Sequence, residues 1–290
     1  MAEIILQEFS DYLEYERRYS PHTIKGYITD LEILGNYLQQ QTPPTGLITV
    51  GVRQIRHWLV ELKTQGIEST SINRKISAMR CFYKYLIKKE IIKISPVSKL
   101  ENLKTPRRLP EFVPDTAMNQ LLDNEELFQN DKNGERNRMI LELFYNTGIR
   151  SSELINIKCR DIDFINCTLT VKGKGNKTRI VPMSETLCSR LRKFVSISDA
   201  PLFKLSNGEP LYPRLVYKIV HQYLEQTQTV SKNSPHTLRH SFATGMLNNG
   251  ADLNAIKELL GHANLSATQI YTHVTYDKLK QVYKQAHPRA

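Results

Sequence analysis

Residues 235–273 read PHTLRHSFATGMLNNGADLNAIKELLGHANLSATQIYTH, a stretch that predicts two consecutive helices with chemically reactive side chains near their ends. Pro235 is a favoured first residue of a helix. His236 and Arg239 follow it three residues apart, so both side chains are expected on one face of that helix. The Asn-Asn-Gly sequence at 248–250 is expected to end it.

The second helix of this stretch is expected to end at Gly261, since glycine is favoured just after a helix C-terminus. His262 would then lie directly beyond that end. Tyr271 follows nine residues later, on an expected third short helix, and Tyr276 is its nearest alternative among the 14 tyrosines. Two histidines, an arginine and a tyrosine near helix ends are residue types that can hold a phosphate and attack it.

The chain is basic: its 290 residues include 40 Lys and Arg against 29 Asp and Glu, for a net charge of +11. This length accommodates two domains with their own cores. The positive charge is unevenly spread, since residues 1–50 carry a net −4 and residues 51–105 a net +8. Concentrated positive charge favours a polyanionic partner, and we expect that partner to be nucleic acid.

The four cysteines show neither CxxC pairs nor disulfide-like spacing, which is typical of a reducing compartment. The N-terminal sequence carries acidic residues early and lacks the layout of a signal peptide. No apolar run approaches the roughly 18 residues that a membrane span needs. We therefore expect a cytoplasmic protein that does not enter a membrane.

Residues 1–103 are predicted to form a helical domain with helices over about 3–18, 21–40, 52–64 and 72–90. Ser20 before Pro21 is typical of an N-cap followed by a favoured first helical residue. Helical spacing predicts the buried stripe of the fourth helix: Ile76, Met79, Phe82, Tyr83 and Leu86. Basic residues cover the rest of that helix: Arg74, Lys75, Arg80, Lys84, Lys88 and Lys89. They could form an ordinary solvated face or a surface that contacts a DNA backbone.

A linker is expected at residues 104–114, because three prolines and the lack of a helical period predict extended chain there. The catalytic domain, with a C-terminal tail, then spans residues 115–290 and begins with a short helix capped by Asp115. Residues 163–182 alternate in the manner of strands and predict a hairpin or a three-stranded sheet. A short, detachable last helix is expected at about 278–285.

Cleavage of a phosphodiester without a metal requires a nucleophile in line with the leaving oxygen and a proton for that oxygen. It also requires cations at the non-bridging oxygens, where negative charge develops. Enzymes lower the barrier to phosphate-ester cleavage by on the order of 20 kcal/mol. Arginines suit this task because the guanidinium group matches the geometry of phosphate. The residue types in this chain allow such chemistry, and we expect no cofactor and no metal.

Four segments of the chain, in order, resemble the tyrosine recombinases (the phage integrase family), especially the bacterial Xer type: TGIRSSEL (147–154), GKGNKTRIVP (173–182), HTLRHSFAT (236–244) and LLGHANLSATQIYTH (259–273). The resemblance covers nearly the whole chain. It implies a mainly α fold with a small antiparallel β-sheet, in which a helical core DNA-binding domain and a catalytic domain form a C-shaped clamp on DNA. It also implies a site-specific recombinase that cuts and rejoins strands through a 3′-phosphotyrosine and a Holliday junction.

The resemblance implies a role for each matching residue. Arg150 and Arg239 are expected to grip the scissile phosphate, and Tyr271 to attack it, leaving a 3′-phosphotyrosine and a free 5′ hydroxyl. His236 is expected to act in acid–base exchange with the nucleophile, and His262 to hydrogen-bond the phosphate. Because the phosphotyrosine conserves the energy of the broken bond, a 5′ hydroxyl of another strand can reverse the step without ATP or metal.

Lys174, in the turn of the predicted hairpin, is expected from the resemblance to protonate the 5′ leaving oxygen. The Gly-Lys-Gly sequence at 173–175 is also explained by a hairpin turn alone. Lys172 and Lys177 lie near enough in the sequence to compete for the role. The spacing of 24 residues between Arg150 and Lys174 is similar to that in Xer recombinases, which favours Lys174.

Some of these residues also admit a purely structural explanation. Arg150 and Glu153 could form only a surface ion pair on a helix, although we expect Glu153 to orient Arg150. His236 and His240 are four residues apart and could ligate zinc, but a complete set of ligands at typical spacing is not evident. We expect His240 to pack beside the site.

The resemblance implies partners as well. They are a double-stranded DNA recombination site and the other subunits of a homotetramer or heterotetramer on DNA. The C-terminal tail of 19 residues after Tyr271 is expected to dock on the neighbouring subunit. An FtsK-type translocase and a second recombinase are further candidate partners. Xer-like chromosome-dimer resolution is the favoured function. The alternatives are an integrase or invertase of a mobile element, a type IB topoisomerase, and a DNA-binding protein without catalysis.

Overall fold

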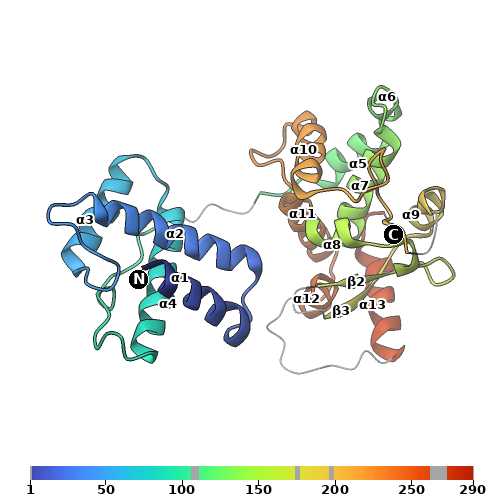
Figure 1. The fold of residues 1–290 in the computed structure, drawn as a ribbon. Coiled ribbons are helices and arrows are strands. Elements are labelled where there is room, and N and C mark those ends of the chain that lie inside the picture. The colour runs from blue at the N-terminus through green and yellow to red at the C-terminus, as the bar shows by residue number, and fades with distance from the viewer. Residues whose placement is uncertain (1, 106–110, 174–176, 196–198, 262–272, 290) are drawn as a thin grey trace. The chain divides into compact units, whose positions relative to one another are not determined.

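The structure is a computed structural model that describes residues 2–105, 111–173, 177–195, 199–261 and 273–289. The chain divides into two compact units, Met1–Arg108 and Leu109–Ala290, each with its own hydrophobic core (Figure 1). Residues 106–110, in the middle of the expected linker, lie outside the described part. No helix within the described ranges combines the length and the apolar character needed to cross a membrane.

The N-terminal unit is helical, with α1 (Ala2–Asp11), a π-helical turn η1 (Tyr12–Glu16), α2 (Pro21–Gln39), α3 (Val52–Thr64) and α4 (Ser69–Lys88). The first predicted helix therefore changes to the wider π form at Tyr12, which apolar spacing does not reveal. The start of α2 is as predicted, since the Ser20 hydroxyl accepts a hydrogen bond from the Thr23 N–H at 3.3 Å. Pro21 takes the first helical position, where no intrahelical donor is needed.

The predicted buried stripe of α4 is confirmed, because none of its five side chains is more than 1% exposed: Ile76, Met79, Phe82, Tyr83 and Leu86. The stripe packs against the other helices of the unit. The ring of Phe9 on α1 meets that of Phe82 edge to face, with centroids 5.2 Å apart. Burial of apolar and aromatic surface of this kind stabilises the unit.

Several basic residues of α4 are bound within the N-terminal unit. Lys75 is 7% exposed, and its ammonium lies 2.7 Å from Asp30 Oδ1. Arg74 contacts the other oxygen, Asp30 Oδ2, at 2.6 Å. Arg80 donates a hydrogen bond to the Leu100 carbonyl at 2.5 Å. The prediction that Lys75 lies on an exposed basic face is therefore wrong, because the buried carboxylate of Asp30 requires a counter-charge.

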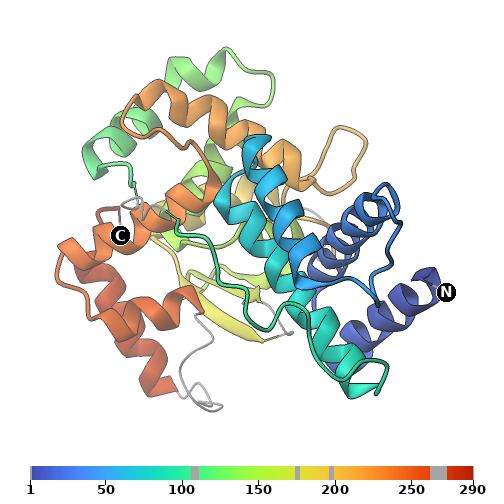
Figure 2. The same ribbon diagram turned by 90° about the vertical axis from the view of Figure 1, so that its left-hand side faces the viewer.

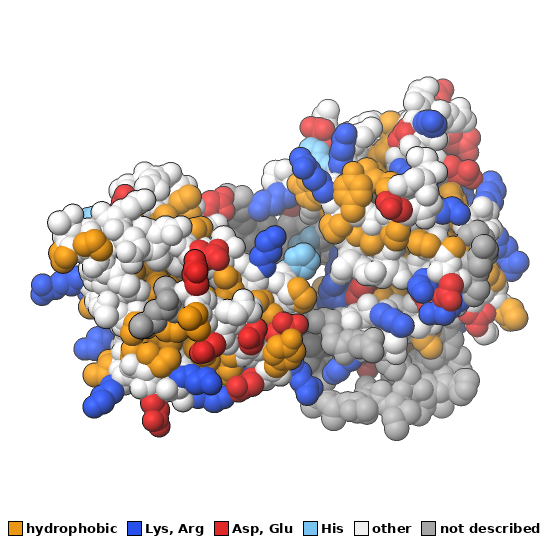
Figure 3. All heavy atoms as spheres, in the orientation of Figure 1, with side chains coloured by type: hydrophobic (Ala, Val, Ile, Leu, Met, Phe, Trp, Pro, Cys, Tyr) orange, Lys and Arg blue, Asp and Glu red, His pale blue; other side chains and the backbone are white. Residues whose placement is uncertain are grey.

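The remaining charges do not form one patch on the face of the N-terminal unit seen in Figure 3. There the Lys and Arg side chains are scattered among acidic and apolar ones. Lys88, for example, lies 2.5 Å from Glu16, and both side chains are about half exposed. The net +8 of residues 51–105 is thus partly neutralised by local ion pairs within the unit.

The C-terminal unit contains α5 (Asp115–Asp123), α6 (Glu125–Gln129), α7 (Gly134–Thr147), α8 (Ser151–Asn156), α9 (Glu185–Leu191), α10 (Pro213–Leu224), α11 (Pro235–Asn248), α12 (Leu253–Leu260) and α13 (His273–Ala286). Its short 3-10 turns are η2 (Cys159–Asp161), η4 (Arg192–Phe194) and η5 (Glu225–Thr227). Asp115 is not the predicted N-cap, since Pro114 takes that position and Asp115 opens α5. The Asp115 carboxylate instead accepts a hydrogen bond from the Tyr145 hydroxyl at 2.6 Å, which ties α5 to α7.

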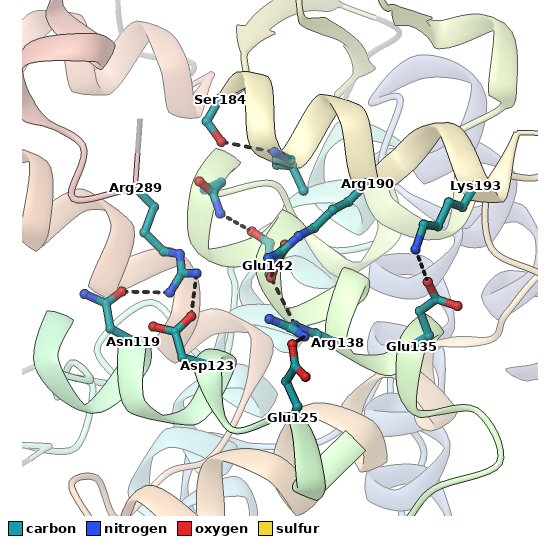
Figure 4. Close-up of polar contacts among 12 residues, drawn as sticks. Asn119, Asp123, Glu125, Glu135, Arg138, Glu142, Ser184, Arg190, Lys193 and Arg289 are labelled. Carbon is teal, nitrogen blue, oxygen red and sulfur yellow. Dashed lines mark hydrogen bonds and ion pairs between the residues drawn. The ribbon is translucent and has the colours of Figure 1, made fainter. Parts of the chain in front are cut away.

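Helix α7 is the central helix of this unit. It is buried without interruption from Met139 to Thr147, so it is covered on more faces than an amphipathic helix would be. Even its polar Glu142 is 3% exposed, and the carboxylate is paired with Arg138 of α7 and Arg190 of α9 (Figure 4). Helix α11 packs along α7. The residues at the C-terminal end of α7 are therefore held firmly.

A three-stranded antiparallel sheet confirms the prediction for residues 163–182. Its strands, in the order β1-β2-β3, are β1 (Ile162–Asp163), β2 (Thr168–Lys172) and β3 (Thr178–Pro182). Leu169 pairs with Val181 and Val171 with Arg179, and all four side chains are buried. Helices α12 and α13 lie against β3 (Figures 1 and 2). A charged residue of β3, Arg179, therefore takes an inward position.

Helix α13 is longer than the predicted 278–285, and it packs on the unit to which it belongs. Leu279, Tyr283 and Ala286 are buried in a cluster formed with α11 and α12. His287 follows the helix, with its ring stacked on that of Tyr283 at a centroid distance of 5.0 Å. His287 Nε2 lies 3.2 Å from the carbonyl oxygen of Tyr145. Burial lowers the pKa of His287 to about 4.

The last described residue is fastened to the same unit. The Arg289 guanidinium donates hydrogen bonds to Asn119 Oδ1 at 3.1 Å and to Asp123 Oδ1 at 2.8 Å, both on α5 (Figure 4). The aromatic contacts of His287 and the ionic contact of Arg289 therefore act together. In the isolated chain the C-terminal segment is docked in place.

Candidate active site

Arg150 lies at the start of α8, directly after a sharp turn. Helix α7 ends at Gly148, whose φ of +59° suits glycine, and the chain then runs extended through Arg150 (φ −85°, ψ 156°). The Glu153 carboxylate accepts hydrogen bonds from the Arg150 backbone N–H at 2.7 Å and from Arg150 Nη1 at 2.8 Å. Glu153 thus orients Arg150. With Glu153 only 4% exposed, the pair is not a surface ion pair.

Glu153 is shared with a second arginine, Arg179 of β3. Arg179 donates from Nη1 to Glu153 Oε1 at 2.8 Å and from Nη2 to Oε2 at 2.9 Å. Burial raises the pKa of Glu153, but the hydrogen bonds and charge of Arg179, followed by the hydrogen bonds from Arg150, outweigh it and lower the pKa below its ordinary value. The carboxylate is therefore ionised at neutral pH and holds both arginines.

The helix that carries His236 and Arg239 begins as predicted. Ser234 caps α11 through its hydroxyl oxygen, and Pro235 takes the first helical position. The two side chains differ in exposure, since Arg239 is 7% exposed whereas His236 is exposed to solvent. At the first turn of α11 the structure therefore offers an accessible imidazole, and one turn later a buried guanidinium.

Arg239 joins two separate chain segments. Its Nη1 donates to the carbonyl oxygen of Gly148 at 2.5 Å, and its Nη2 to that of Leu260 at 2.6 Å. Burial, followed by the nearby charges of Arg150 and Arg179, lowers the pKa of Arg239 to about 10. The guanidinium is still charged at neutral pH.

Three arginines donate hydrogen bonds to the last carbonyl groups of α12. The pairs are Arg179–Leu259 (2.8 Å), Arg239–Leu260 (2.6 Å) and Arg150–Gly261 (3.5 Å). Carbonyl groups at a helix C-terminus lack intrahelical partners and carry partial negative charge, so cations are favoured there. The two predicted phosphate-binding arginines therefore converge at the end of α12, and His262 is the next residue in the chain.

His240 packs beside this region, as expected. Its ring meets that of Phe112 edge to face at a centroid distance of 6.5 Å. Burial, followed by the charge of His236, lowers the pKa of His240. Across the residues that the structure describes, no three or more His, Cys, Asp or Glu side chains are grouped so that they could hold a metal.

The other predicted site residues, Lys174, His262 and Tyr271, lie outside the described residues. The residues directly before two of them are described. Gly173 closes the base of the β2–β3 turn with a 2.7 Å backbone hydrogen bond. Gly261 follows the last residue of α12 with φ +64°, which confirms it as the predicted glycine at the helix C-terminus.

Arg179 is the residue of this region that the sequence motifs do not single out. Strand alternation carries the missing signal, because Arg179 is two residues before the buried Val181 and so shares its inward face. A charged side chain at an inward position of a small sheet is rarely tolerated without a buried partner. The pattern alone could have pointed to a buried ion pair.

The chain matches known protein families in both of its units. Residues 111–278 match the Phage integrase family, and residues 6–90 match the N-terminal SAM-like domain of phage integrases. This chain belongs to the phage integrase family. The family that the four sequence segments resemble is therefore confirmed.

Curated relatives are similar over nearly the whole chain. Tyrosine recombinase XerC of Halalkalibacterium halodurans is 39% identical over 297 residues, covering 96% of this chain and 95% of the relative. Tyrosine recombinase XerC of Staphylococcus haemolyticus is 39% identical over 289 residues, covering 97% of this chain and 96% of the relative. The chain is thus a Xer-like tyrosine recombinase, an enzyme of site-specific recombination that cleaves and rejoins DNA strands.

Solved structures share the fold. The XerH site-specific recombinase bound to its difH substrate has a TM-score of 0.69 at 24% identity, covering 95% of this chain and 83% of that one. The Tn1549 transposon integrase in complex with circular intermediate DNA has a TM-score of 0.67 at 19% identity, covering 94% of this chain and 98% of that one. The predicted mainly helical fold with a small antiparallel sheet is confirmed.

Proposed function

We propose that the catalytic residues of this recombinase are Arg150, Lys174, His236, Arg239, His262 and Tyr271. The Tyr271 hydroxyl attacks the scissile phosphorus, the bond to the 5′ oxygen breaks, and a 3′-phosphotyrosine and a 5′ hydroxyl result. His236 accepts the proton of Tyr271, and Lys174 donates a proton to the 5′ oxygen. His262 donates a hydrogen bond to the phosphate. Religation runs through the same steps in reverse.

The charge at the end of α12 is the observation that carries this proposal. There Arg150 and Arg179 pair with the carboxylate of Glu153, and the charge of Arg239 lies within electrostatic range of all three, so these four groups carry a net +2. Mutual repulsion contributes to the lowered pKa of Arg239. An anion held against the guanidinium groups relieves that repulsion.

The net charge of +2 is matched better by the transition state of phosphodiester cleavage than by the bound substrate. It carries one negative charge in the ground state and gains a second as the tyrosine oxygen adds to phosphorus. A site with a net charge of about +2 therefore stabilises the transition state more than the bound substrate, which is the condition for catalysis. The fixed hydrogen bonds of Arg150 to Glu153, and of Arg239 to backbone carbonyls, keep these cations from reorganising during the reaction.

The accessible position of His236 supports its role as the proton acceptor. It lies one helical turn before Arg239 and is exposed to solvent, whereas Arg239 is buried. A general base must come within hydrogen-bond reach of the attacking hydroxyl. An imidazole at the exposed first turn of α11 can be reached by a tyrosine from another segment.

We propose that the natural substrate is a duplex recombination site on the chromosome, and that the enzyme resolves chromosome dimers in the cytoplasm through a Holliday junction. The similarity to XerC proteins over nearly the whole chain supports this role. In this proposal the N-terminal unit is the core DNA-binding domain, and residues 115–290 form the catalytic domain. The further partners we propose for such a role are an FtsK-type translocase and, in a heterotetramer, a second recombinase.

The active assembly we propose is a homotetramer or heterotetramer on DNA, joined through the C-terminal tail. In the isolated chain α13 packs on its own unit through Leu279, Tyr283 and Ala286. The same apolar surface of α11 and α12 can accept the α13 of a neighbour when identical chains assemble. Exchange of α13 would make cleavage depend on assembly, and deletion from Lys278 onward should abolish both.

The experiment that tests the chemistry traps the covalent intermediate. Wild type, Tyr271→Phe and the control Tyr276→Phe are mixed in EDTA with a supercoiled library of chromosomal and mobile-element DNA, and DNA bound covalently after denaturation is sequenced. We expect an adduct at one discrete 3′ phosphate for wild type and Tyr276→Phe, and none for Tyr271→Phe. An adduct that survives Tyr271→Phe would overturn the assigned nucleophile.

The sequenced adducts also test the biological role. Chromosome-dimer resolution predicts one major site on the chromosome, with no dependence on a mobile element. A site confined to the ends of a mobile element would instead assign the enzyme as an integrase or invertase. Binding to DNA without any adduct would contradict the catalytic proposal for the protein acting alone.

A further inference from the structure

We infer that Arg179 is a positioning residue for DNA cleavage: it fixes Glu153, and through it Arg150, relative to Gly173 and Gly261. The inference rests on the proposed catalytic role of Arg150. It goes beyond the six proposed catalytic residues, because Arg179 is buried and acts only through the groups that it holds.

Arg179 uses three of its donors on two groups, one carboxylate and one backbone carbonyl. Nη1 and Nη2 bind the two oxygens of Glu153 at 2.8 and 2.9 Å, and Nε binds the carbonyl oxygen of Leu259 at 2.8 Å. The planar fork of arginine can make this set of bonds, whereas a lysine ammonium cannot make the bidentate pair. The side chain therefore ties β3 to α8 and to the end of α12.

Two glycines lie directly against this ion pair. A Cβ added at Gly261 would lie 3.0 Å from Cδ and 3.3 Å from Nη1 of Arg179. A Cβ added at Gly173 would lie 3.5 Å from Glu153 Oε1 and 3.8 Å from Arg179 Nη1. The backbone at both glycines therefore lies close to the Arg179–Glu153 pair.

Each of these two glycines directly precedes a proposed catalytic residue. The residue after Gly173 is Lys174, and the residue after Gly261 is His262. Arg179 thus lies close to the described residues that precede Lys174 and His262, and it shares a carboxylate with Arg150. A single buried guanidinium is the common contact of three parts of the site.

Stability alone does not explain a buried ion pair at this place. Removing two charges from water costs about as much as their attraction returns, and apolar side chains of similar volume often stabilise a protein as well or better. What apolar side chains cannot supply is the hydrogen-bonded orientation of Arg150 by Glu153. A positioning role therefore predicts that a mutation can restore the stability of the fold without restoring the rate of DNA cleavage.

The test uses the full-length protein and a nicked duplex that carries the cleavage site mapped by the adduct experiment. The variants are Arg179→Lys, Arg179→Met and the double variant Glu153→Met with Arg179→Met. Arg138→Met is the matched control, because Arg138 also pairs with a buried carboxylate of this unit, that of Glu142. Each is measured for its Tm, its DNA affinity against salt, and its single-turnover cleavage rate.

We expect Arg179→Met to cleave roughly 100-fold more slowly than wild type, as a displacement of reacting groups by about 1 Å does. Its DNA affinity and salt dependence should match wild type, since Arg179 does not reach the surface. Arg179→Lys should be intermediate. The double variant should recover the Tm without recovering the cleavage rate, and Arg138→Met should lose Tm but cleave normally.

The cleavage rate of a substrate with a 5′-bridging sulfur distinguishes a positioning role of Arg179 from a purely structural one. The thiolate leaves without a proton, so such a substrate rescues the loss of a proton donor but not the loss of charge stabilisation by Arg150. We expect Arg179→Met to stay slow on it. Full rescue would overturn the route through Glu153 and Arg150.

Wild-type cleavage by the double variant would overturn the inference by assigning Arg179 a purely structural role. The proposed function fails separately, and is recognised by an adduct that persists in Tyr271→Phe. If Tyr271→Phe is inert while Arg179→Met cleaves at the wild-type rate, only the inference about Arg179 fails.

Discussion

Arg239 Nη1 donates a hydrogen bond to the carbonyl oxygen of Gly148, which lies 2.5 Å away and 91 residues earlier in the chain. This contact joins α11 to the turn that places Arg150. Gly148 has φ +59°, and a Cβ there would lie 2.6 Å from Phe242 Cδ1 and 2.8 Å from Leu260 Cδ2. Both proposed phosphate-binding arginines therefore depend on a turn that only glycine fits.

Gly148→Ala should lower both stability and cleavage. The left-handed backbone costs a non-glycine residue about 1–2 kcal/mol, and overpacking of the surrounding side chains adds about 1–3 kcal/mol. Displacement of the Gly148 carbonyl would also move Arg239. Chemical denaturation and single-turnover cleavage measure the two losses.

Gly208→Ala is the matched control, because Gly208 has φ +87° but nothing lies within 4 Å of an added Cβ. It should lose only the backbone contribution of about 1–2 kcal/mol and cleave normally. If Gly148→Ala and Gly208→Ala lose equal stability, the close contacts of the added Cβ with Phe242 and Leu260 do not lower the stability of Gly148→Ala.

The buried ion pair with Asp30 predicts that Lys75 stabilises the N-terminal unit and does not contact DNA. Lys75→Met should destabilise the N-terminal unit by roughly 2 kcal/mol, since the buried carboxylate of Asp30 would keep only its half-exposed partner Arg74. Asp30→Leu combined with Lys75→Met should recover most of that loss. Lys88→Met, which breaks an exposed pair with Glu16, should destabilise the unit much less.

The salt dependence of DNA binding tests whether Lys75 contacts a phosphate instead. Each phosphate contact that is lost reduces the salt dependence of binding by about one counterion. Lys75→Met should leave that slope unchanged when measured on the folded protein. A slope reduced by about one would mean that Lys75 reaches a phosphate in the complex.

Helix boundaries were predictable where a cap residue or a glycine fixes them through local chemistry. Ser20 and Pro21 fix the start of α2, and Gly261 fixes the end of α12, through contacts within a few residues. The resemblance to tyrosine recombinases likewise rests on short segments. What lies within one turn of the chain can be read from the sequence.

The partners of buried charges were not predictable, because they depend on which distant faces meet. Helical spacing places Lys75 among the basic residues outside the buried stripe of α4, yet its partner Asp30 lies 45 residues earlier on another helix. Arg179 and Glu153 are 26 residues apart on a strand and a helix. Helical or strand periodicity shows that a charged residue faces inward, but packing alone decides what neutralises it.

The buried imidazole of His287 predicts that the docking of α13 weakens in acid. Its ordinary pKa of 6.5 falls to about 4 in the docked state, through burial and then the nearby charge of Arg289. The undocked or unfolded state therefore binds a proton first as the pH falls. Docking is fully favoured above pH 6.5 and loses up to about 3 kcal/mol as the pH falls from 6.5 to 4.

Amide hydrogen exchange of residues 279–286 at pH 7 and pH 5, corrected for intrinsic exchange rates, measures this effect. Protection should fall at pH 5 in wild type. His287→Phe keeps an aromatic ring without a titrating group and should remove the pH dependence, while His221→Gln, at an exposed histidine, should retain it. A dependence that persists in His287→Phe would assign the titration to another group.

Arg239→Lys should make the charge at position 239 depend on pH, whereas the Arg239 guanidinium stays charged at neutral pH. A lysine ammonium cannot reach both the Gly148 and Leu260 carbonyls as a guanidinium does, so cleavage should be roughly 100-fold slower even when the lysine is charged. Burial, Arg150 and Arg179 already lower the pKa of the arginine to about 10, and the same causes should lower that of a lysine further. The lysine is charged below its pKa, so its activity should fall as the pH rises.

The ratio of the Arg239→Lys rate to the wild-type rate, measured from pH 7 to pH 9, isolates this effect, because titrations shared by both proteins cancel in the ratio. We expect the ratio to fall by roughly tenfold across that range as the buried lysine loses its proton. Arg239→Met, which carries no charge at any pH, should show a low and constant ratio. A constant ratio for Arg239→Lys as well would mean that the substituted ammonium stays solvated, and that burial does not govern the charge at this position.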